Sequence, residues 1–255
     1  MHARTLPARH GALWLVGAFT LFRRNPALLA ALTFGYLLIV LLLNTLPAIG
    51  PVLLAIALPA LTAMLGNGCH AIERRHPPTF AELTRGIESR SRDLARLGLL
   101  NLGASMLIIL AGIALGLDLK VEANVDQARA ADLLRRFAAL MLVASPVLAA
   151  FWFAPLLTLW NGIEPMKSVF FSFIAAWRNW RAFAMYGLVV GALLMLLPAL
   201  LLVLVNLVSG QLVELLAVVL RAALVFVLAP TLVASVYLSY RDVFHTPARD
   251  IDVAV

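Results

Sequence analysis

The sequence predicts an all-α integral membrane protein with six transmembrane helices and three interfacial amphipathic helices. Composition is the first reason, because 63% of the 255 residues are hydrophobic and 13% are charged. A soluble domain has about 45–50% apolar and about 25% charged residues. The second reason is that the apolar residues form six runs close in length to the roughly 20 residues that a helix needs to cross a bilayer. We therefore expect a single membrane domain over residues 1–255, since no shift in composition marks a domain boundary.

The six apolar runs are separated by polar segments or by helix-breaking residues. They cover residues 27–46, 52–68, 97–117, 137–160, 182–205 and 215–238. Residues 1–10 do not read as a cleaved signal peptide, because the first long apolar run starts too late and no small-residue cleavage site follows it. The single cysteine, Cys69, excludes an intramolecular disulfide framework and a zinc or iron–sulfur site built from several cysteines.

The net charge of +7 comes almost entirely from arginine. In a soluble protein such an excess would suggest nucleic acid, but here the arginines lie beside apolar runs, which favours anionic lipid and no nucleic acid. Placing both termini in the cytoplasm puts 15 of the 20 Lys and Arg residues on the cytoplasmic side. The positive-inside rule therefore predicts a bacterial inner-membrane protein with both ends cytoplasmic.

Residues 165–183 carry the clearest interfacial helix. Ser168, Ser172, Ala175 and Asn179 would share one small, polar face, while aromatic rings run down another face. Aromatic rings beside cationic side chains suit the boundary between lipid and water. Residues 11–22 form a second such segment, and Thr79 to Glu82 match a capping box that would begin a third, running to residue 96. The predicted interfacial anchors are Trp14, Phe22, Arg23, Arg24, Trp177, Arg178, Asn179, Trp180, Arg181, Tyr240 and Arg241.

A threefold repeat of amphipathic helix, span, turn and span is one interpretation of this order. Its units would cover residues 10–69, 79–160 and 165–240, and the second span of each unit carries a helix-kinking proline: Pro59, Pro155 or Pro230. The alternative is that membrane sequences resemble one another by composition alone. The spacing of these prolines is uneven, so both interpretations stay open.

Four short motifs resemble a known family. Residues 22–26, 152–155, 177–183 and 237–244 are similar to an uncharacterised proteobacterial family of multi-pass inner-membrane proteins. In style the family is close to YciC-like proteins and to the membrane domain of some glycerophosphodiester phosphodiesterases. The resemblance implies a bacterial inner-membrane location, and it brings no activity and no catalytic residues.

The candidates for chemistry are few. Arg221 lies within the last span with Glu214 two turns before it on the same face. A cation in a span is often functional, but snorkelling of Arg221 to the headgroups is favoured over a substrate or ion site. Cys69, His70 and His76 match no zinc spacing, and a solvated loop is the favoured interpretation of that segment. The sequence predicts no catalytic residue, no metal and no cofactor, because nucleophile, P-loop and paired-carboxylate motifs are missing.

Two functions follow from these observations. The first is a non-enzymatic membrane protein with a structural, lipid-interacting or partner-binding role, because its distinctive residues lie at the expected interface. The second is a small transporter or channel subunit that uses the proline-kinked helices and Arg221. Anionic lipids are the expected partners, and a protein partner or a homo-oligomer is left open.

Overall fold

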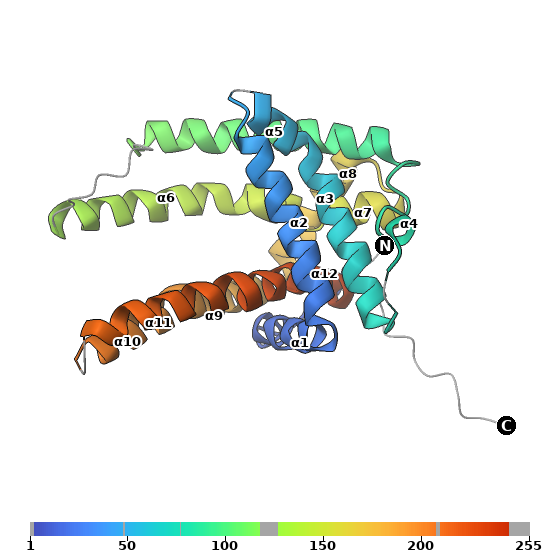
Figure 1. Ribbon diagram of the computed structural model, residues 1–255. Helices are drawn as coiled ribbons and strands as arrows, with labels where there is room; N and C mark the ends of the chain where they lie inside the picture. The colour runs from blue at the N-terminus through green and yellow to red at the C-terminus, as the bar shows by residue number, and fades with distance from the viewer. Residues whose placement is uncertain (1–2, 48, 77, 118–126, 208–209, 245–255) are drawn as a thin grey trace. The chain divides into compact units, whose positions relative to one another are not determined.

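The computed structural model describes residues 3–47, 49–76, 78–117, 127–207 and 210–244 (Figure 1). Throughout these residues every ordered element is helical, which confirms the all-α prediction. The α-helices are α1 (His10–Arg24), α2 (Pro26–Asn44), α3 (Ile49–Glu73), α4 (Phe80–Leu83), α5 (Ser91–Ala114), α6 (Gln127–Trp152), α7 (Ala154–Asn161), α8 (Pro165–Arg178), α9 (Trp180–Gly191), α10 (Leu197–Asn206), α11 (Gly210–Ala223) and α12 (Ala229–Phe244). Two π-helical segments, η1 (Ala192–Leu196) and η2 (Leu224–Leu228), lie within the last two long helical stretches.

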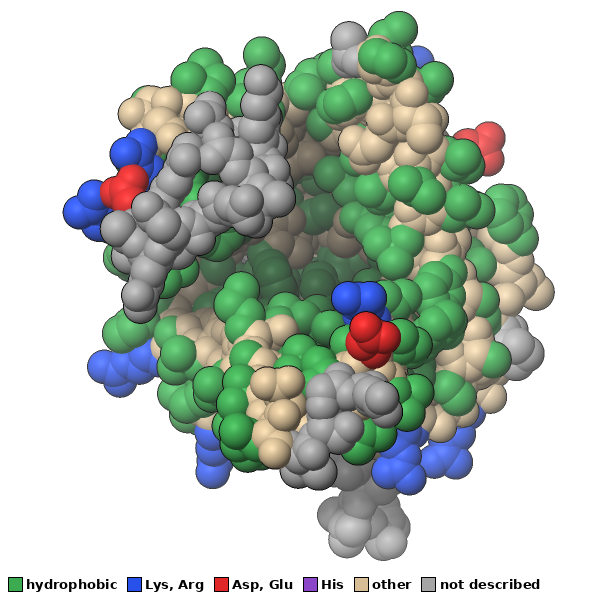
Figure 2. Space-filling model, turned by 60° about the vertical axis from the view of Figure 1, so that its left-hand side comes forward, with side chains coloured by type: hydrophobic (Ala, Val, Ile, Leu, Met, Phe, Trp, Pro, Cys, Tyr) green, Lys and Arg blue, Asp and Glu red, His purple; other side chains and the backbone are tan. Residues whose placement is uncertain are grey.

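Six helical segments in the described residues are long and apolar enough to cross a membrane, which confirms the predicted number of spans. Large apolar side chains along them stay exposed, including Leu107 (64%), Leu142 (76%) and Met195 (71%). Figure 2 shows how hydrophobic side chains dominate the face in view. Apolar surface on this scale needs a non-aqueous surrounding, since soluble monomers rarely expose it.

The described residues form two compact units. The first contains the described residues within 1–39, 64–85 and 175–244, and the second contains those within 40–63 and 86–174. α2, α3 and α8 each contribute one end to each unit. This division tests neither the predicted single membrane domain nor the predicted threefold repeat, so both stay predictions.

The first unit is built around α1, which packs against α9 and α12. Trp14 is buried and meets Phe183 edge to face, with 5.3 Å between the ring centroids. Gly11 permits this close approach, because a Cβ there would lie 2.0 Å from the backbone oxygen of Ala182. On α12 the Ser235 hydroxyl lies 2.8 Å from the hydroxyl of Tyr186. Small and hydroxyl side chains bring these helices together, as is common between membrane helices.

The second unit pairs α5 with α6, which run alongside each other in Figure 1. Gly98 of α5 lies against the backbone of Ile56 in α3, where a Cβ would come within 2.4 Å of the Ile56 carbonyl oxygen. Asn101 donates from Nδ2 to the carbonyl of Ala55, at 3.3 Å. This bond from a partly buried asparagine links α5 to α3.

The polar face predicted for residues 165–183 is present, and its side chains are buried against other parts of the protein. Ser168, Ser172, Ala175 and Asn179 are all at most 1% exposed. In the second unit the Ser172 hydroxyl accepts from the N–H of Phe153 (2.9 Å) and donates to the carbonyl of Ala149 (2.8 Å). It therefore inserts between the two groups that an uninterrupted helix would join, so α6 ends and α7 begins at Phe153.

The single helix predicted from residue 79 to residue 96 is wrong. The capping box at Thr79 is present, but α4 ends at Leu83 after one turn. Gly86 then adopts φ +79°, which a continuing right-handed helix does not allow, and α5 begins at Ser91. The predicted helix over residues 165–183 is also divided, because Asn179 (φ −106°, ψ 19°) separates α8 from α9.

Three prolines of the spans have different positions relative to the helices. Pro59 lies inside α3, and Pro155 occupies the first turn of α7, where its missing N–H is not needed. Pro230 follows η2, in which the N–H of Ala229 donates to Leu224, five residues back. Pro230 has no N–H to donate to the carbonyl four positions earlier, and the π-helical turn lies directly before it. Helix kinks at Pro59, Pro155 and Pro230 stay a prediction. The helical hydrogen bonds just before Pro155 and Pro230 do differ from the regular α-helical pattern, which agrees with that prediction.

Candidate functional site

The C-terminal end of α3 is closed by a Schellman motif with an arginine in its left-handed position. The N–H of Arg75 donates to the carbonyl of Ile72 (3.0 Å), and the N–H of His76 donates to that of Ala71 (3.3 Å). Arg75 has φ +62°, and among the described residues no other non-glycine residue has a positive φ. Glycine is usual at this position, because a left-handed conformation costs other residues roughly 1–2 kcal/mol. A strained residue of this kind gives reason to look for a function in its side chain.

The corner between α1 and α2 lies against this helix end. Asn25 separates the two helices and caps α2, since its Oδ1 accepts the N–H of Leu28 at 3.1 Å. Arg24 donates from Nη1 to the carbonyl of Glu73, at 3.3 Å. A cation at the last carbonyls of a helix also interacts favourably with the helix dipole. The N-terminus of α2 and the C-terminus of α3 are therefore held together by the α1 corner.

A polar cluster adjoins the same helix end. The carboxylate of Glu73 accepts hydrogen bonds from the hydroxyl of Tyr237 and from the guanidinium of Arg241. Arg241 also donates to Asp242 (2.9 Å), and Nδ1 of His70 lies 3.1 Å from the Tyr237 hydroxyl. We call His70, Glu73, Tyr237, Arg241 and Asp242 the Glu73 cluster. It ties α3 to α12, and it engages the side chain of Glu73, whose backbone carbonyl accepts from Arg24.

A basic pocket of about 290 Å³ opens at this place. Arg24, Asn25, Ile72, Arg75 and His76 line it, and we call these five residues the basic pocket. Within the described residues neither Arg24 nor Arg75 belongs to an ion pair, and both are exposed. α2 begins beside the pocket, after Asn25, and α3 ends there, so the positive end of one helix dipole and the negative end of another meet at the pocket. Two guanidinium groups that have no ion-pair partner among the described residues form a suitable environment for an anion.

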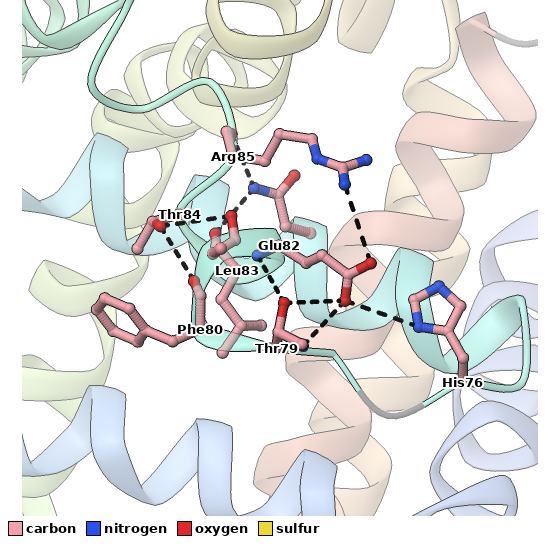
Figure 3. A network of polar contacts seen from close by, with 9 residues as sticks. His76, Thr79, Phe80, Glu82, Leu83, Thr84 and Arg85 are labelled. Carbon is pink, nitrogen blue, oxygen red and sulfur yellow. Dashed lines mark hydrogen bonds and ion pairs between the residues drawn. The ribbon is translucent and has the colours of Figure 1, made fainter.

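His76 is positioned by the capping box of α4 (Figure 3). Thr79 accepts the N–H of Glu82 at its hydroxyl (3.3 Å), and the Glu82 carboxylate accepts the N–H of Thr79 (2.9 Å). The same carboxylate lies 3.9 Å from Nδ1 of His76 and 3.9 Å from the guanidinium of Arg85. The backbone hydrogen bond from Thr79 first, and these cationic neighbours after it, hold the pKa of Glu82 below its usual range. The exposed carboxylate is thus ionised at neutral pH and fixed against one wall residue of the basic pocket.

Most of the predicted interfacial anchors are at the surface. Trp177 is 66% exposed and Trp180 is 59% exposed. The guanidinium of Arg181 lies over the Trp180 ring, 5.5 Å from its centroid. Arg23, Arg24, Arg178 and Arg181 are exposed, while Phe22 and Arg241 are partly buried. The exposure of these side chains is compatible with lipid contact, and their anchoring role stays a prediction.

Three of the predicted anchors are buried instead. Trp14 is 1%, Asn179 1% and Tyr240 0% exposed. Asn179 holds the N-terminal segment, because its Oδ1 accepts the N–H of Leu6 (2.8 Å) and its Nδ2 donates to the carbonyl of Arg4 (2.9 Å). A side chain without solvent access cannot reach headgroups, so these three residues pack the first unit.

The other predicted candidates are not brought together. Arg221 and Glu214 are both exposed, and no ion pair joins them in the part of the chain that is described. Cys69 is fully buried within α3, so the prediction of a solvated loop at Cys69 and His70 is wrong. α3 continues through Cys69 and His70, so the loop starts only after Glu73. Pro77 and Pro78 follow in the sequence, and a residue that precedes a proline disfavours the helical conformation. Among the described residues no group of three metal-binding side chains occurs.

A protein of Burkholderia thailandensis named Probable inner membrane protein BTH_II0599 is 33% identical to this chain over 197 residues. The match covers 71% of this chain and 72% of the relative. The chain belongs to the same family as this probable inner membrane protein. With its six candidate spans it is a multi-pass membrane protein. No family model matches the chain, and no solved structure does.

The sequence interpretation missed the left-handed Arg75 and the Glu73 cluster. A signal for Arg75 exists, because Pro77 and Pro78 require α3 to end just before them, and no glycine is present there to take the left-handed position. Glu73 was assigned to a loop, whereas an acidic residue at the end of an apolar run needs a cationic partner. That partner, Arg241, lies 168 positions away, and one sequence alone does not reveal such a pairing.

Proposed function

We propose that the protein is a non-enzymatic inner-membrane protein that binds anionic lipid at the headgroup layer. The binding surface is the one formed by Trp177, Arg178, Trp180 and Arg181 at the corner between α8 and α9. The observation that carries this proposal is the orientation of that corner, whose polar face is buried and whose aromatic rings are exposed. Exposed tryptophans beside guanidinium groups are favoured where apolar and aqueous phases meet.

The positive-inside bias supports placing this surface, both termini and the basic pocket at the cytoplasmic leaflet, whose lipids are often anionic. The likeness to YciC-like proteins and to glycerophosphodiester phosphodiesterase membrane domains stays an expectation, and nothing in this proposal depends on it. A cysteine introduced at Asp126, which lies outside the described residues, tests the orientation. Labelling of that cysteine from the cytoplasm alone would reverse it.

Replacing Trp177 and Trp180 together by alanine tests the lipid-binding surface. We expect anionic lipid that co-purifies with the protein to fall roughly tenfold, which corresponds to about 1.4 kcal/mol. The matched control replaces Leu142 and Met195, which are equally exposed along the spans, and should leave anionic lipid unchanged while removing similar apolar area. Unchanged anionic lipid in the double tryptophan variant would show that this surface does not bind headgroups.

The transporter alternative gains no support from Arg221, because its side chain is exposed on α11 rather than enclosed among polar groups. An exposed arginine about two turns inside a span is suited to snorkelling toward the headgroups. Arg221→Leu in reconstituted vesicles tests this interpretation. We expect normal membrane insertion and no change in ion leakage, whereas a change in leakage would favour a transport pathway.

A further inference from the structure

We propose that the basic pocket binds a phosphate monoester group. The inference goes beyond the proposed lipid contact of α8 and α9, since it concerns another surface and a defined ligand chemistry. It rests on the proposed function only in needing a membrane-embedded chain whose arginine-rich side meets the headgroups. The phosphate can belong to a lipid headgroup or to a small soluble ester, and the experiment below separates the two sources.

The charges around the basic pocket support an anionic ligand. Arg24 and Arg75 supply two guanidinium groups, and His76 supplies an imidazole. Of the nearby carboxylates, Glu73 is bonded to Tyr237 and Arg241. Glu82 is bonded to the backbone of Thr79 and also lies 3.9 Å from Nδ1 of His76, so the positive charge offered to a ligand is that of the two arginines. Arg24 and Arg75 have no ion-pair partner among the described residues, and two such arginines in a concave site recognise phosphate oxygens well, since each guanidinium presents parallel N–H donors.

The size and the position of the pocket favour a compact group. A volume of about 290 Å³ is at the lower limit of ligand pockets, which span roughly 300–1,000 Å³. It lies at the start of one span, α2, and at the end of the next, α3, so it opens on the face of the membrane where the headgroups lie. Basic pockets between membrane helices on the cytoplasmic side are known sites for phosphorylated headgroups. A monoester carries more negative charge than a diester and therefore gains more from two guanidinium groups.

The backbone at Arg75 gives a separate reason. Arg75 stands where a glycine would close the helix without strain, so the fold alone does not explain the arginine. A strained residue that also lines a cavity is the pattern expected where a side chain is held for binding. Arg75→Gly therefore removes the guanidinium while relaxing the backbone, which separates ligand binding from folding.

The test uses the full chain in nanodiscs of phosphatidylcholine with either phosphatidic acid or phosphatidylglycerol, and counts retained lipid by native mass spectrometry. We expect about tenfold stronger retention of phosphatidic acid, the monoester, over phosphatidylglycerol, the diester. Arg75→Gly and Arg24→Gln should each abolish this preference, with the thermal midpoint of Arg75→Gly not lowered. Arg74→Gln is the matched control, because Arg74 carries the same charge next to the pocket without lining it, and it should keep the preference.

Inorganic phosphate and glycerol 3-phosphate at millimolar concentration form the second arm. Thermal stabilisation by these soluble probes in the wild-type chain and not in Arg75→Gly, without selective retention of phosphatidic acid, assigns the site to a soluble ester. Selective retention of phosphatidic acid assigns it to a lipid. The proposal is overturned if neither arm shows binding, or if Arg75→Gly binds as the wild type does. The variant lacking Trp177 and Trp180 should keep the monoester preference, so failure at the α8 and α9 surface is distinguishable from failure here.

Discussion

The C-terminal ends of α3 and α5 have the same backbone arrangement and different left-handed residues. In α5 the N–H of Gly116 donates to Ile113 (2.9 Å) and that of Leu117 donates to Gly112 (3.0 Å). Gly116 has φ +67°, close to the φ of +62° at Arg75. One helix thus ends on the residue that this conformation favours, and the other ends on a residue that it strains.

Each of these two ends is also capped by an arginine from another helix. Arg136 of α6 donates to the carbonyls of Leu115 (3.0 Å) and Gly116 (3.2 Å). Arg24 of α1 donates to the carbonyl of Glu73. Arg136 is further paired with Asp132 at 2.6 Å, so the end of α5 has its charge compensated. The comparison shows that an arginine at a helix end can act only in stabilising the fold, as Arg136 does. Arg75 does not fit this stabilising role, because its backbone is strained and it has no acidic partner among the described residues.

Among the variants that compare the ends of α3 and α5, Gly116→Ala should change the free energy of unfolding most. A Cβ at Gly116 would lie 2.3 Å from Nη1 of Arg136 and would face an unfavourable φ. We expect the free energy of unfolding in detergent to fall by about 2 kcal/mol. Gly103→Ala, at an open position of the same helix, should instead raise stability by roughly 0.5–1 kcal/mol. Equal stabilities for the two variants would contradict the assigned role of Gly116.

Arg136→Gln tests the compensated charge and should cost about 1 kcal/mol. The variant loses the ion pair with Asp132 and weakens the cap on Leu115 and Gly116, while partial exposure of the side chain limits the loss. Arg135→Gln is the control, since Arg135 pairs with Asp132 but is 80% exposed and caps nothing. We expect it to change the unfolding free energy by less than about 0.5 kcal/mol. A similar cost for both would assign the effect to the ion pair and not to the cap.

Arg75→Gly is expected to act in the opposite direction at the end of α3. Relief of the left-handed strain, roughly 1–2 kcal/mol, exceeds the added flexibility of glycine in the unfolded chain, roughly 0.5–1 kcal/mol. The net result is a gain of about 0.5 kcal/mol in the free energy of unfolding. A clear loss would mean that the Arg75 side chain stabilises the fold, and the contrast with Gly116 would then disappear.

The smallest effect concerns pH and the segment that follows α3. The pKa of Glu82 is lowered in the folded chain, so its contribution to stability is complete at pH values above the usual carboxyl range. This contribution is lost as the pH falls through the lowered pKa, because protonation weakens the capping box and the contacts with His76 and Arg85. Hydrogen exchange in α4 should accelerate in that acidic range in the wild type. Glu82→Gln should remove the pH dependence, and a persistent dependence would assign it to another group.

The spans and the shared face of α8 could be predicted because both depend on local periodicity. An apolar run near the length of a bilayer crossing is visible in one sequence, and so is the spacing of Ser168, Ser172 and Asn179. The contacts of that face could not be predicted, because its partners lie elsewhere in the sequence. The Ser172 hydroxyl accepts from the N–H of Phe153, and Asn179 accepts from the N–H of Leu6. Periodicity reports which residues share a face and gives no information on the partner of that face.

The candidate site was only partly visible for the same reason. Arg24 was identified from its position beside a span, but its partner at Glu73 is 49 positions away. The helix predicted from Thr79 failed because the capping box specifies where a helix begins and not how far it continues. Gly86 then takes a left-handed conformation that helical periodicity over residues 79–96 does not show.

The N-terminal segment has a consequence for the biosynthesis of the protein. The N–H of Arg4 donates to the carbonyl of Val243 in the last helix, and Asn179 binds the backbone of Arg4 and Leu6. Domains form as the chain emerges, from the N-terminus onward, so the second unit, residues 40–63 and 86–174, can assemble while synthesis continues. Arg4 must instead wait until Val243 has been synthesised. Closure of the first unit therefore follows assembly of the second, and it occurs only in chains that have been translated through α12.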